Sequence, residues 1–242
     1  MSTIFIAEMM GTMFLILMGN GVVANILLKN TGGHGGGILA ITAAWGFAVF
    51  IGLLVATNLG SAGELNPATA IASWANGKYT LYESAMYISG ELIGAILGAF
   101  LVWLLYKDHF NVTADSPQLQ RACFCTSPAI KNTPLNFFSE FLGTFVLLFV
   151  VLCFTASEAK IGSLDKWPIT TLVWGIGLSL GGTTGYAINP ARDLGPRIVH
   201  FIVPIKGKGT SDWSYAWIPI LGPILGALFA LFLYQAIKQY TY

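Results

Sequence analysis

The sequence predicts an all-α membrane protein built from six transmembrane helices and two half-helices, arranged as an inverted internal repeat. Apolar residues make up 55% of the 242-residue chain and charged residues only 10%. A soluble domain carries about 25% charged residues, so water is not the main solvent of this chain. The apolar residues fall in six long stretches, and the tripeptide Asn-Pro-Ala occurs once in each half of the sequence.

The six apolar stretches are each long enough for a transmembrane helix, which needs about 20 mostly apolar residues. The alternative is a soluble domain with buried helices, but six such runs exceed what one core of this size covers. The N-terminal run lacks a basic segment and carries Glu8 early, so we expect a first span and not a cleaved signal peptide. The expected spans are 4–28, 38–60, 83–106, 136–156, 168–187 and 216–237.

Three signatures recur in the same order in the two halves. Glu-x-x-Gly-Thr begins at Glu8 and again at Glu140, Asn-Pro-Ala follows in each half, and a Gly-x-Ile-Leu-Gly-Ala motif begins at Gly94 and at Gly222. Each half holds three spans, so the halves cross the membrane in opposite directions, and the functional site is expected at their interface. We expect a single transmembrane domain, 1–242, with repeat 1 at about 1–106, a connecting loop at about 107–135 and repeat 2 at about 136–242.

Each Asn-Pro-Ala motif predicts the start of a short helix. Asn is a favoured N-cap and Pro suits the first helical turn. The helices expected over 67–76 and from 190 to about 201 are too short to span, so at membrane depth they must line a wet cavity or be buried in protein. A lone motif would only indicate a helix starting in a turn, whereas two in matching repeats predict half-helices that meet near the midplane. The motif residues are Asn66, Pro67, Ala68, Asn189, Pro190 and Ala191.

Two such helix starts would suit a narrow pore for uncharged solutes. Each Asn oxygen can accept from its own helix, which leaves the amide hydrogens to donate into the lumen. A water bonded to both amides has its hydrogens pointing outward, which interrupts a proton wire, and the positive helix ends oppose cations. The Gly-rich segments ahead of the motifs are either flexible turns or extended backbone that offers a ladder of carbonyls to a solute. The expected ladder residues are Gly63, Glu64, Leu65, Gly185, Tyr186 and Ala187.

Charged residues inside the apolar stretches need partners or water. Arg192 follows the second motif, and a central Arg costs about 2.5–3.5 kcal/mol on insertion scales, so it either lies beside the solute path or is satisfied by carbonyls. Asp193 and Arg197 have the i,i+4 spacing of a pair on a helix face. Glu8 and Glu140 suit either a proton relay or hydrogen bonds to the irregular loops, and their symmetric placement favours the loops.

Other function classes find little support. A net charge of +1 gives no reason to expect a nucleic-acid partner, and three cysteines are too few for a disulfide framework. No nucleophile elbow or metalloprotease motif is present, so we expect neither an enzyme nor a cofactor or metal. A secondary transporter also uses inverted repeats and broken helices, but it needs a coupling-ion site or gating charges.

The paired motifs resemble those of the major intrinsic proteins, the aquaporin family, over nearly the whole chain. Three features resemble its aquaglyceroporin or glycerol-facilitator branch: Asp193 after the second motif, Arg197 four residues on, and Pro219 in the last span. The resemblance implies a right-handed helix bundle, forming a homotetramer in the plasma membrane. It implies a passive channel for glycerol and other small uncharged solutes, with some water and with undissociated lactic acid as a plausible extra. Protons and ions would be excluded.

The family's narrow selectivity filter carries over by position onto Trp45, Gly177, Tyr186 and Arg192. The resemblance implies that the two aromatic residues face a solute's carbon backbone while Arg192 and loop carbonyls bind its hydroxyls. A water-selective aquaporin, the alternative within the family, typically has His where Gly177 lies. Tyr186 in place of Phe adds a hydroxyl, which could shift selectivity towards water or small acids. Glu64 stands where many relatives have His.

Overall fold

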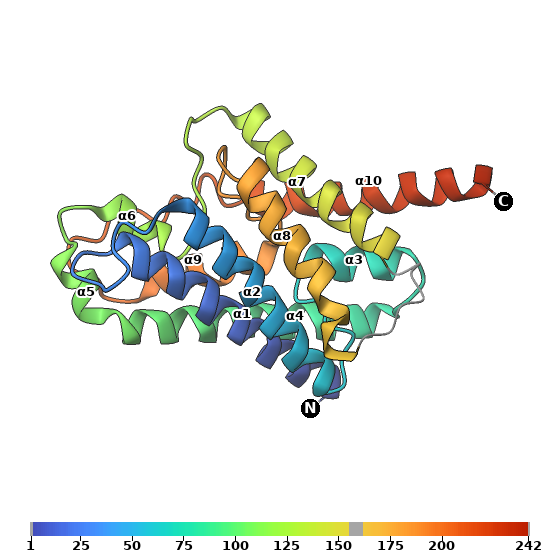
Figure 1. Cartoon of the computed structure of the whole chain (residues 1–242), viewed down its shortest axis with the longest axis horizontal. Coiled ribbons are helices and arrows are strands. Elements are labelled where there is room, and N and C mark those ends of the chain that lie inside the picture. The colour runs from blue at the N-terminus through green and yellow to red at the C-terminus, as the bar shows by residue number, and fades with distance from the viewer. Residues whose placement is uncertain (1, 155–161, 242) are drawn as a thin grey trace.

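The computed structural model of this chain describes residues 2–154 and 162–241, and all regular elements in these ranges are helices, as predicted. The elements are α1 (Thr3–Leu27), α2 (Gly37–Asn58), α3 (Pro67–Ala75), α4 (Leu81–Leu105), α5 (Lys107–Val112), α6 (Pro117–Ala122), α7 (Thr133–Phe154), η1 (Gly162–Lys166), α8 (Trp167–Leu180), α9 (Pro190–Ile202) and α10 (Ile218–Thr241). Figure 1 shows long helices crossing the molecule, with α5 and α6 gathered at one end and the C-terminal end of α10 projecting at the other.

Five helices in the described ranges are long and apolar enough to cross a membrane: α1, α2, α4, α7 and α10. They coincide with five of the six expected spans to within a few residues, which confirms the prediction for this part of the bundle. The span expected over 136–156 is helical to Phe154, and residues 155–156 lie outside the described ranges. Pro219 is the second residue of α10, in the first turn where a proline is tolerated.

The span expected over 168–187 is helical only as far as Leu180. Helix α8 has 14 residues, which at about 1.5 Å per residue is ~21 Å, shorter than a bilayer core. Beyond it the chain turns, and the backbone N–H of Ala187 bonds the side chain of Glu140 instead of a helical carbonyl. The prediction was wrong for 181–187 because an apolar run does not by itself distinguish a helix from a buried, extended loop.

The two half-helices lie inside the bundle and begin at the residues expected. Helix α3 has 9 residues and α9 has 13, and each has an Asn N-cap followed by Pro at the first helical position. Helix α3 ends one residue earlier than expected and α9 continues one residue further, to Ile202. Both half-helices pack against α4 and α10, and they also contact each other.

The connecting stretch expected as a loop over 107–135 holds two short helices, α5 and α6, and the first residues of α7. Pro117 occupies the first position of α6, where its fixed φ suits a helix start. The buried ring of Phe110 on α5 stacks on Phe124 at a centroid distance of 5.4 Å. The Lys29 N–H donates to the Thr113 hydroxyl at 3.0 Å, and α6 contacts α1. The stretch is therefore packed against the bundle, which its Pro and charge content did not indicate.

Close helix pairs are built in the same way in both halves. Helix α1 packs on α4, and α7 packs on α10. A Cβ added at Gly94 would lie 2.2 Å from the Met9 carbonyl oxygen, and one added at Gly226 would lie 2.2 Å from that of Phe141. Such contacts require Gly, as in other membrane helix pairs. The repeat boundaries themselves stay a prediction.

Polar and apolar side chains are distributed as in a membrane protein. The chain leaves large apolar side chains exposed along its long helices, Leu105 and Phe232 among them, while Glu8, Arg197 and His200 are fully buried. A soluble protein would bury its apolar residues and rarely bury so many charges. The exposed apolar surface suits lipid, and the buried polar groups surround the centre of the bundle.

Candidate functional site: a cavity between two half-helices

The two half-helices meet through the side chains that cap them. The side-chain nitrogen of Asn66 donates to the carbonyl oxygen of Ile188 at 2.8 Å, and that of Asn189 donates to the carbonyl oxygen of Leu65 at 2.7 Å. Leu65 and Ile188 have φ of 52° and 44°, a region that L residues seldom occupy. Each loop is therefore bonded to the other in the same way, and the strained residue before each Asn supplies the acceptor.

The Asn oxygens hold their own helices. Asn66 Oδ1 accepts from the Ala68 N–H at 3.0 Å, and Asn189 Oδ1 accepts from the N–H groups of Ala191 and Arg192 at 3.0 and 3.2 Å. Each side-chain amide has two hydrogens, and the crossed bonds use one of each. The sequence-based expectation that both amide hydrogens of each Asn donate into the lumen is therefore wrong by one hydrogen. One amide hydrogen per Asn remains to donate to a solute.

Glu8 binds the loop ahead of the first half-helix. Its Oε1 accepts from the Ser61 hydroxyl at 2.5 Å and from the backbone N–H groups of Gly63 and Glu64 at 3.1 and 3.2 Å, and its Oε2 accepts from the Leu65 N–H at 2.8 Å. The carboxyl is fully buried. By binding the N–H side of this loop, Glu8 leaves the carbonyl groups to other donors, and that of Leu65 accepts from Asn189.

Glu140 binds the second loop from the equivalent place on α7. It accepts from the backbone N–H groups of Ala187 and Ile188 at 3.0 and 2.8 Å, and it is also fully buried. Both acids are thus engaged in loop hydrogen bonds, which is the arrangement that their symmetric placement favours over a proton relay.

A third buried acid was missed by sequence reasoning. Glu91 lies on α4, is fully buried, and accepts from the backbone N–H of Asn66 at 2.9 Å. The signal was present in the sequence, because an acidic residue inside an apolar span marks a functional position by default. It has no counterpart in the motifs that revealed the repeat, and for that reason it was overlooked.

A cavity of about 130 Å³ lies between the half-helices and α1, α2, α7 and α8. A water needs roughly 10–15 Å³ of such space, so the cavity accommodates several small molecules. Apolar side chains such as Leu147 and Val173 form one wall. The expected site residues that line it are Trp45, Gly63, Glu64, Leu65, Asn66, Tyr186, Ala187, Asn189 and Arg192.

The remaining expected pore residues do not line this cavity. Pro67, Ala68, Pro190 and Ala191 are buried in the first turns of the half-helices. Gly185 lies in the second loop with φ of 82°, and Gly177 stands behind the ring of Tyr186. These residues shape the cavity without forming its surface.

Trp45 and Arg192 form one corner of the cavity. The guanidinium carbon of Arg192 lies over the indole, 4.1 Å from the ring centroid. Arg192 is 8% exposed and donates to the carbonyl oxygen of Phe124 at 3.3 Å. No carboxylate in the described part of the chain lies within ion-pair distance of this guanidinium. The corner therefore combines an aromatic face with an uncompensated positive charge, held by a carbonyl and a ring.

Tyr186 completes the corner, and α8 makes room for its ring. A Cβ added at Gly181 would lie 2.4 Å from Tyr186 Cδ1, and one added at Gly177 would lie 2.9 Å from Tyr186 Cζ and Oη and from Thr42 Cγ2. The hydroxyl is buried there and has no hydrogen-bond partner among the described residues. The polar group that distinguishes Tyr from Phe thus points at α8 and not at the solute space.

Asp193 and Arg197 form a fully buried ion pair, where the spacing suggested a pair on a helix face. Arg197 Nη2 lies 2.7 Å from Asp193 Oδ1. The guanidinium also donates to the backbone carbonyls of Ser211, Asp212 and Thr126, and Asp193 accepts from the Thr126 N–H at 2.7 Å. This pair joins α9 to the loops that precede α7 and α10. Asp193 follows Arg192 directly in the sequence, so this ion pair holds in place the helix α9 that carries Arg192.

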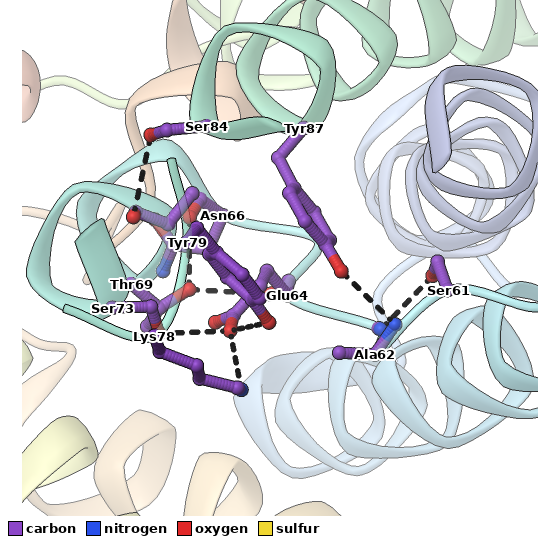
Figure 2. A network of polar contacts seen from close by, with 12 residues as sticks. Ser61, Ala62, Glu64, Asn66, Thr69, Ser73, Lys78, Tyr79, Ser84 and Tyr87 are labelled. Atoms are coloured by element: carbon purple, nitrogen blue, oxygen red, sulfur yellow. Dashed lines mark hydrogen bonds and ion pairs between the residues drawn. The ribbon is translucent and has the colours of Figure 1, made fainter. Parts of the chain in front are cut away.

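Figure 2 shows a second charged network, centred on Glu64. Glu64 also lines the cavity. Glu64 Oε1 accepts from the Tyr79 hydroxyl at 2.8 Å, the Ser73 hydroxyl at 2.9 Å and the Lys78 ammonium at 3.1 Å. Burial raises the pKa of Tyr79, and the charge of Glu64 raises it further, so this phenol remains a donor. The network fastens a loop residue to the turn between α3 and α4.

Comparison with known proteins agrees with this geometry. The sequence profile described as Major intrinsic protein matches residues 1–234. A probable glycerol uptake facilitator protein of Thermotoga maritima is 45% identical, with 96% of this chain and 98% of that protein covered. A D/L-lactic acid transporter of Lactiplantibacillus plantarum is 40% identical, with 93% of each chain covered.

The fold is also that of a solved structure. The X-ray structure of the aquaglyceroporin from Plasmodium falciparum superposes with a TM-score of 0.82 at 32% identity, and 96% of this chain and 94% of that chain are covered. The bundle is thus the aquaporin fold that the resemblance implied, and the protein is a multi-pass membrane protein. With the profile matching nearly its whole length, the chain belongs to the major intrinsic protein family.

Proposed function

We propose that the protein is a passive channel for glycerol and similar small uncharged solutes, with some permeability to water. The observation that carries this proposal is the cavity's asymmetry. One corner holds Trp45, Tyr186 and the Arg192 guanidinium, and aliphatic side chains such as Leu147 and Val173 also line the cavity. A polyol has hydroxyls along one edge and C–H groups along the other, and it fits such a surface without losing its hydrogen bonds.

Solutes pass in single file by exchanging hydrogen-bond partners. The carbonyls of the loops held by Glu8 and Glu140 accept from solute hydroxyls, while Arg192 and the remaining Asn66 and Asn189 hydrogens donate to them. Because the cost of removing water is offset at each position, a neutral solute meets no deep well and no high barrier.

Ions and protons are excluded by the same groups. The N-termini of α3 and α9 and the charge of Arg192 oppose cations at the centre of the path. A water that accepts hydrogen bonds from both Asn66 and Asn189 has both lone pairs of its oxygen occupied. It therefore cannot accept a proton from a neighbouring hydronium. Anions would have to leave their hydration shell for a wall that is mostly aliphatic.

Undissociated lactic acid is a second solute that the channel is proposed to conduct. It is close to glycerol in size, and one relative at 40% identity is a D/L-lactic acid transporter. The Tyr186 hydroxyl does not support this preference, since it is buried against α8. Because the lactate anion is excluded, the total lactic acid flux must fall as pH rises above the pKa of the acid.

We further propose that four copies assemble in the plasma membrane, each with its own pore. The supporting observations are the family membership and the apolar side chains exposed on the long helices. A water-selective channel is disfavoured because Gly177 provides room for Tyr186 and, among the described residues, no imidazole lines the cavity. A coupled transporter is disfavoured because Glu8 and Glu140 are committed to loop hydrogen bonds.

Stopped-flow light scattering of proteoliposomes tests this function. We expect glycerol influx with a low activation energy, linear in the glycerol gradient and independent of Na⁺ and of the proton gradient. Vesicles without protein provide the background, and an ion gradient that drives glycerol uphill would overturn the proposal.

A further inference from the structure

The helix behind the constriction carries a residue that no motif singles out. Gly19 is buried on α1, which faces the indole of Trp45. A Cβ added at Gly19 would lie 2.3 Å from Trp45 Cζ3 and 2.5 Å from Cε3 and Cη2. Three neighbouring ring atoms at these distances place the Cβ against the face of the ring. The indole therefore rests directly on the α1 backbone.

The backbone of α1 cannot easily retreat from the ring. The next residue, Asn20, donates from its side chain to the carbonyl oxygen of Phe124 at 3.3 Å, the same oxygen that accepts from Arg192. Helix α1 is also in backbone contact with α4, where a Cβ added at Gly98 would lie 2.5 Å from the Met13 carbonyl oxygen. A clash at Gly19 is thus relieved by moving the indole.

The cavity lies beside the indole, so a push from α1 moves the ring towards the solute space. Trp45 and Arg192 both line the cavity, and the guanidinium lies over the ring at 4.1 Å. Carbon atoms in contact are about 3.5–4.0 Å apart, so a Cβ at Gly19 displaces the ring by roughly 1 Å or more. That displacement carries the ring and the Arg192 side chain into the cavity that they line.

We propose that Gly19 is a specificity-determining residue of the channel: the absence of its side chain sets how far Trp45 withdraws from the solute path, and hence the largest solute that passes. Gly19 is a positioning residue, since it acts through Trp45 and Arg192. This inference rests on the proposed channel function and extends it to a helix that contributes no residue to the Asn-Pro-Ala loops.

The test compares Gly19→Ala with Gly21→Ala in proteoliposomes, with water and glycerol permeabilities measured on the same preparations. Gly21 lies on the same helix, and a Cβ there meets nothing within 4 Å. For Gly19→Ala we expect glycerol permeability to fall about tenfold, a barrier increase of ~1.4 kcal/mol, and water permeability to fall less. Gly21→Ala should match the parent protein in both.

A second variant separates the ring's position from a folding defect. In Gly19→Ala/Trp45→Phe the smaller ring leaves room for the added methyl, so glycerol permeability should recover relative to Gly19→Ala. An unchanged glycerol-to-water ratio in Gly19→Ala would overturn the proposal, and so would a Gly19→Ala protein that fails to fold, because the cavity should absorb the shift. If the parent protein itself conducts no glycerol, the channel function fails instead.

Discussion

The Arg192 guanidinium lies over the face of the Trp45 indole at the edge of the central cavity, with 4.1 Å between the guanidinium carbon and the ring centroid. A cation over an indole contributes about 0.5–1 kcal/mol when exposed and ~2 or more when desolvated. Arg192 is 8% exposed, so this contact belongs to the stronger class. In the proposed channel this pair sets both the width and the charge of the solute path at this corner of the cavity, so a change in either residue should alter both.

Removing the indole should loosen the discrimination between solutes. Trp45→Ala opens the corner and frees Arg192 to move, so polyols larger than glycerol should pass at a rate nearer to that of glycerol. The measurement is the erythritol-to-glycerol permeability ratio in proteoliposomes. Trp213→Ala, which removes a half-exposed indole, is the matched control and should leave the ratio unchanged. An unaltered ratio in Trp45→Ala would show that this residue does not form the constriction.

Both loop-binding acids should contribute to stability. Glu8→Ala leaves the backbone N–H groups of Glu64 and Leu65 without their acceptor, while that of Gly63 keeps the Ser61 hydroxyl. Glu140→Ala likewise leaves two backbone N–H groups without their acceptor. Each buried, unpaired donor costs about 1–3 kcal/mol. Both variants should aggregate at a lower temperature than the parent in detergent, by similar amounts.

The control for this pair is Glu83→Ala, which removes an exposed acid from the capping box of α4 and should shift the aggregation temperature least. If Glu8→Ala were as stable as Glu83→Ala, the proposed support of the first loop would be wrong.

Replacing Tyr186 by Phe should stabilise the protein. The hydroxyl is buried and unpaired among the described residues, an arrangement that costs about 1–3 kcal/mol. Because the hydroxyl faces Gly177 and not the solute, the lactic acid-to-glycerol permeability ratio should change little. A thermal aggregation assay and a two-solute flux measurement check the two parts. A large fall in lactic acid flux alone would place the hydroxyl in the pore.

In the network around Glu64, the Tyr79 hydroxyl should contribute more to the stability of the protein than the Lys78 ammonium does. Lys78 is 52% exposed on its side chain, and exposed ion pairs contribute about 0–1 kcal/mol. The Tyr79 hydroxyl donates to the same carboxylate at 2.8 Å from a half-buried position. Tyr79→Phe should therefore lower the aggregation temperature more than Lys78→Gln does.

The pH dependence of the Tyr79 contribution follows from the direction of its pKa shift. Burial and Glu64 raise the pKa of Tyr79 above its ordinary value, so the protonated donor is favoured in the folded protein. Its contribution is complete below about pH 10, the unfolded value, and is lost only as pH rises through the higher folded value. The stability difference between the parent and Tyr79→Phe should hold constant up to that pH, and a difference already lost at neutral pH would contradict this assignment.

Local chemistry was enough to predict most of the fold. The Asn-Pro pairs predicted where α3 and α9 begin, because capping and the fixed φ of Pro act within a few residues. The prediction failed at 181–187, where an apolar run leaves the helix because Glu140 supplies acceptors from another element. A partner that is distant in sequence is invisible to hydropathy.

The candidate site was likewise predicted in part from the sequence, and the rest of it depends on tertiary packing. The residues expected around the cavity were found from motifs and from a resemblance, and the structure brings Trp45, Tyr186 and Arg192 to one cavity. The direction of the Tyr186 hydroxyl and the place of Gly19 against Trp45 depend on how three helices pack, and no single-sequence pattern reports this. Glu91 was within reach of the sequence and was overlooked.

The central claim is that the crossed Asn66 and Asn189 amides let a neutral solute through while breaking the path for protons. The most direct measurement follows glycerol influx by light scattering and proton influx by an entrapped pH-sensitive dye, in the same proteoliposomes under the same gradients. The account predicts rapid glycerol entry with a proton leak no greater than that of protein-free vesicles. Glycerol entry accompanied by a protein-dependent proton current, or no glycerol entry at all, would contradict it.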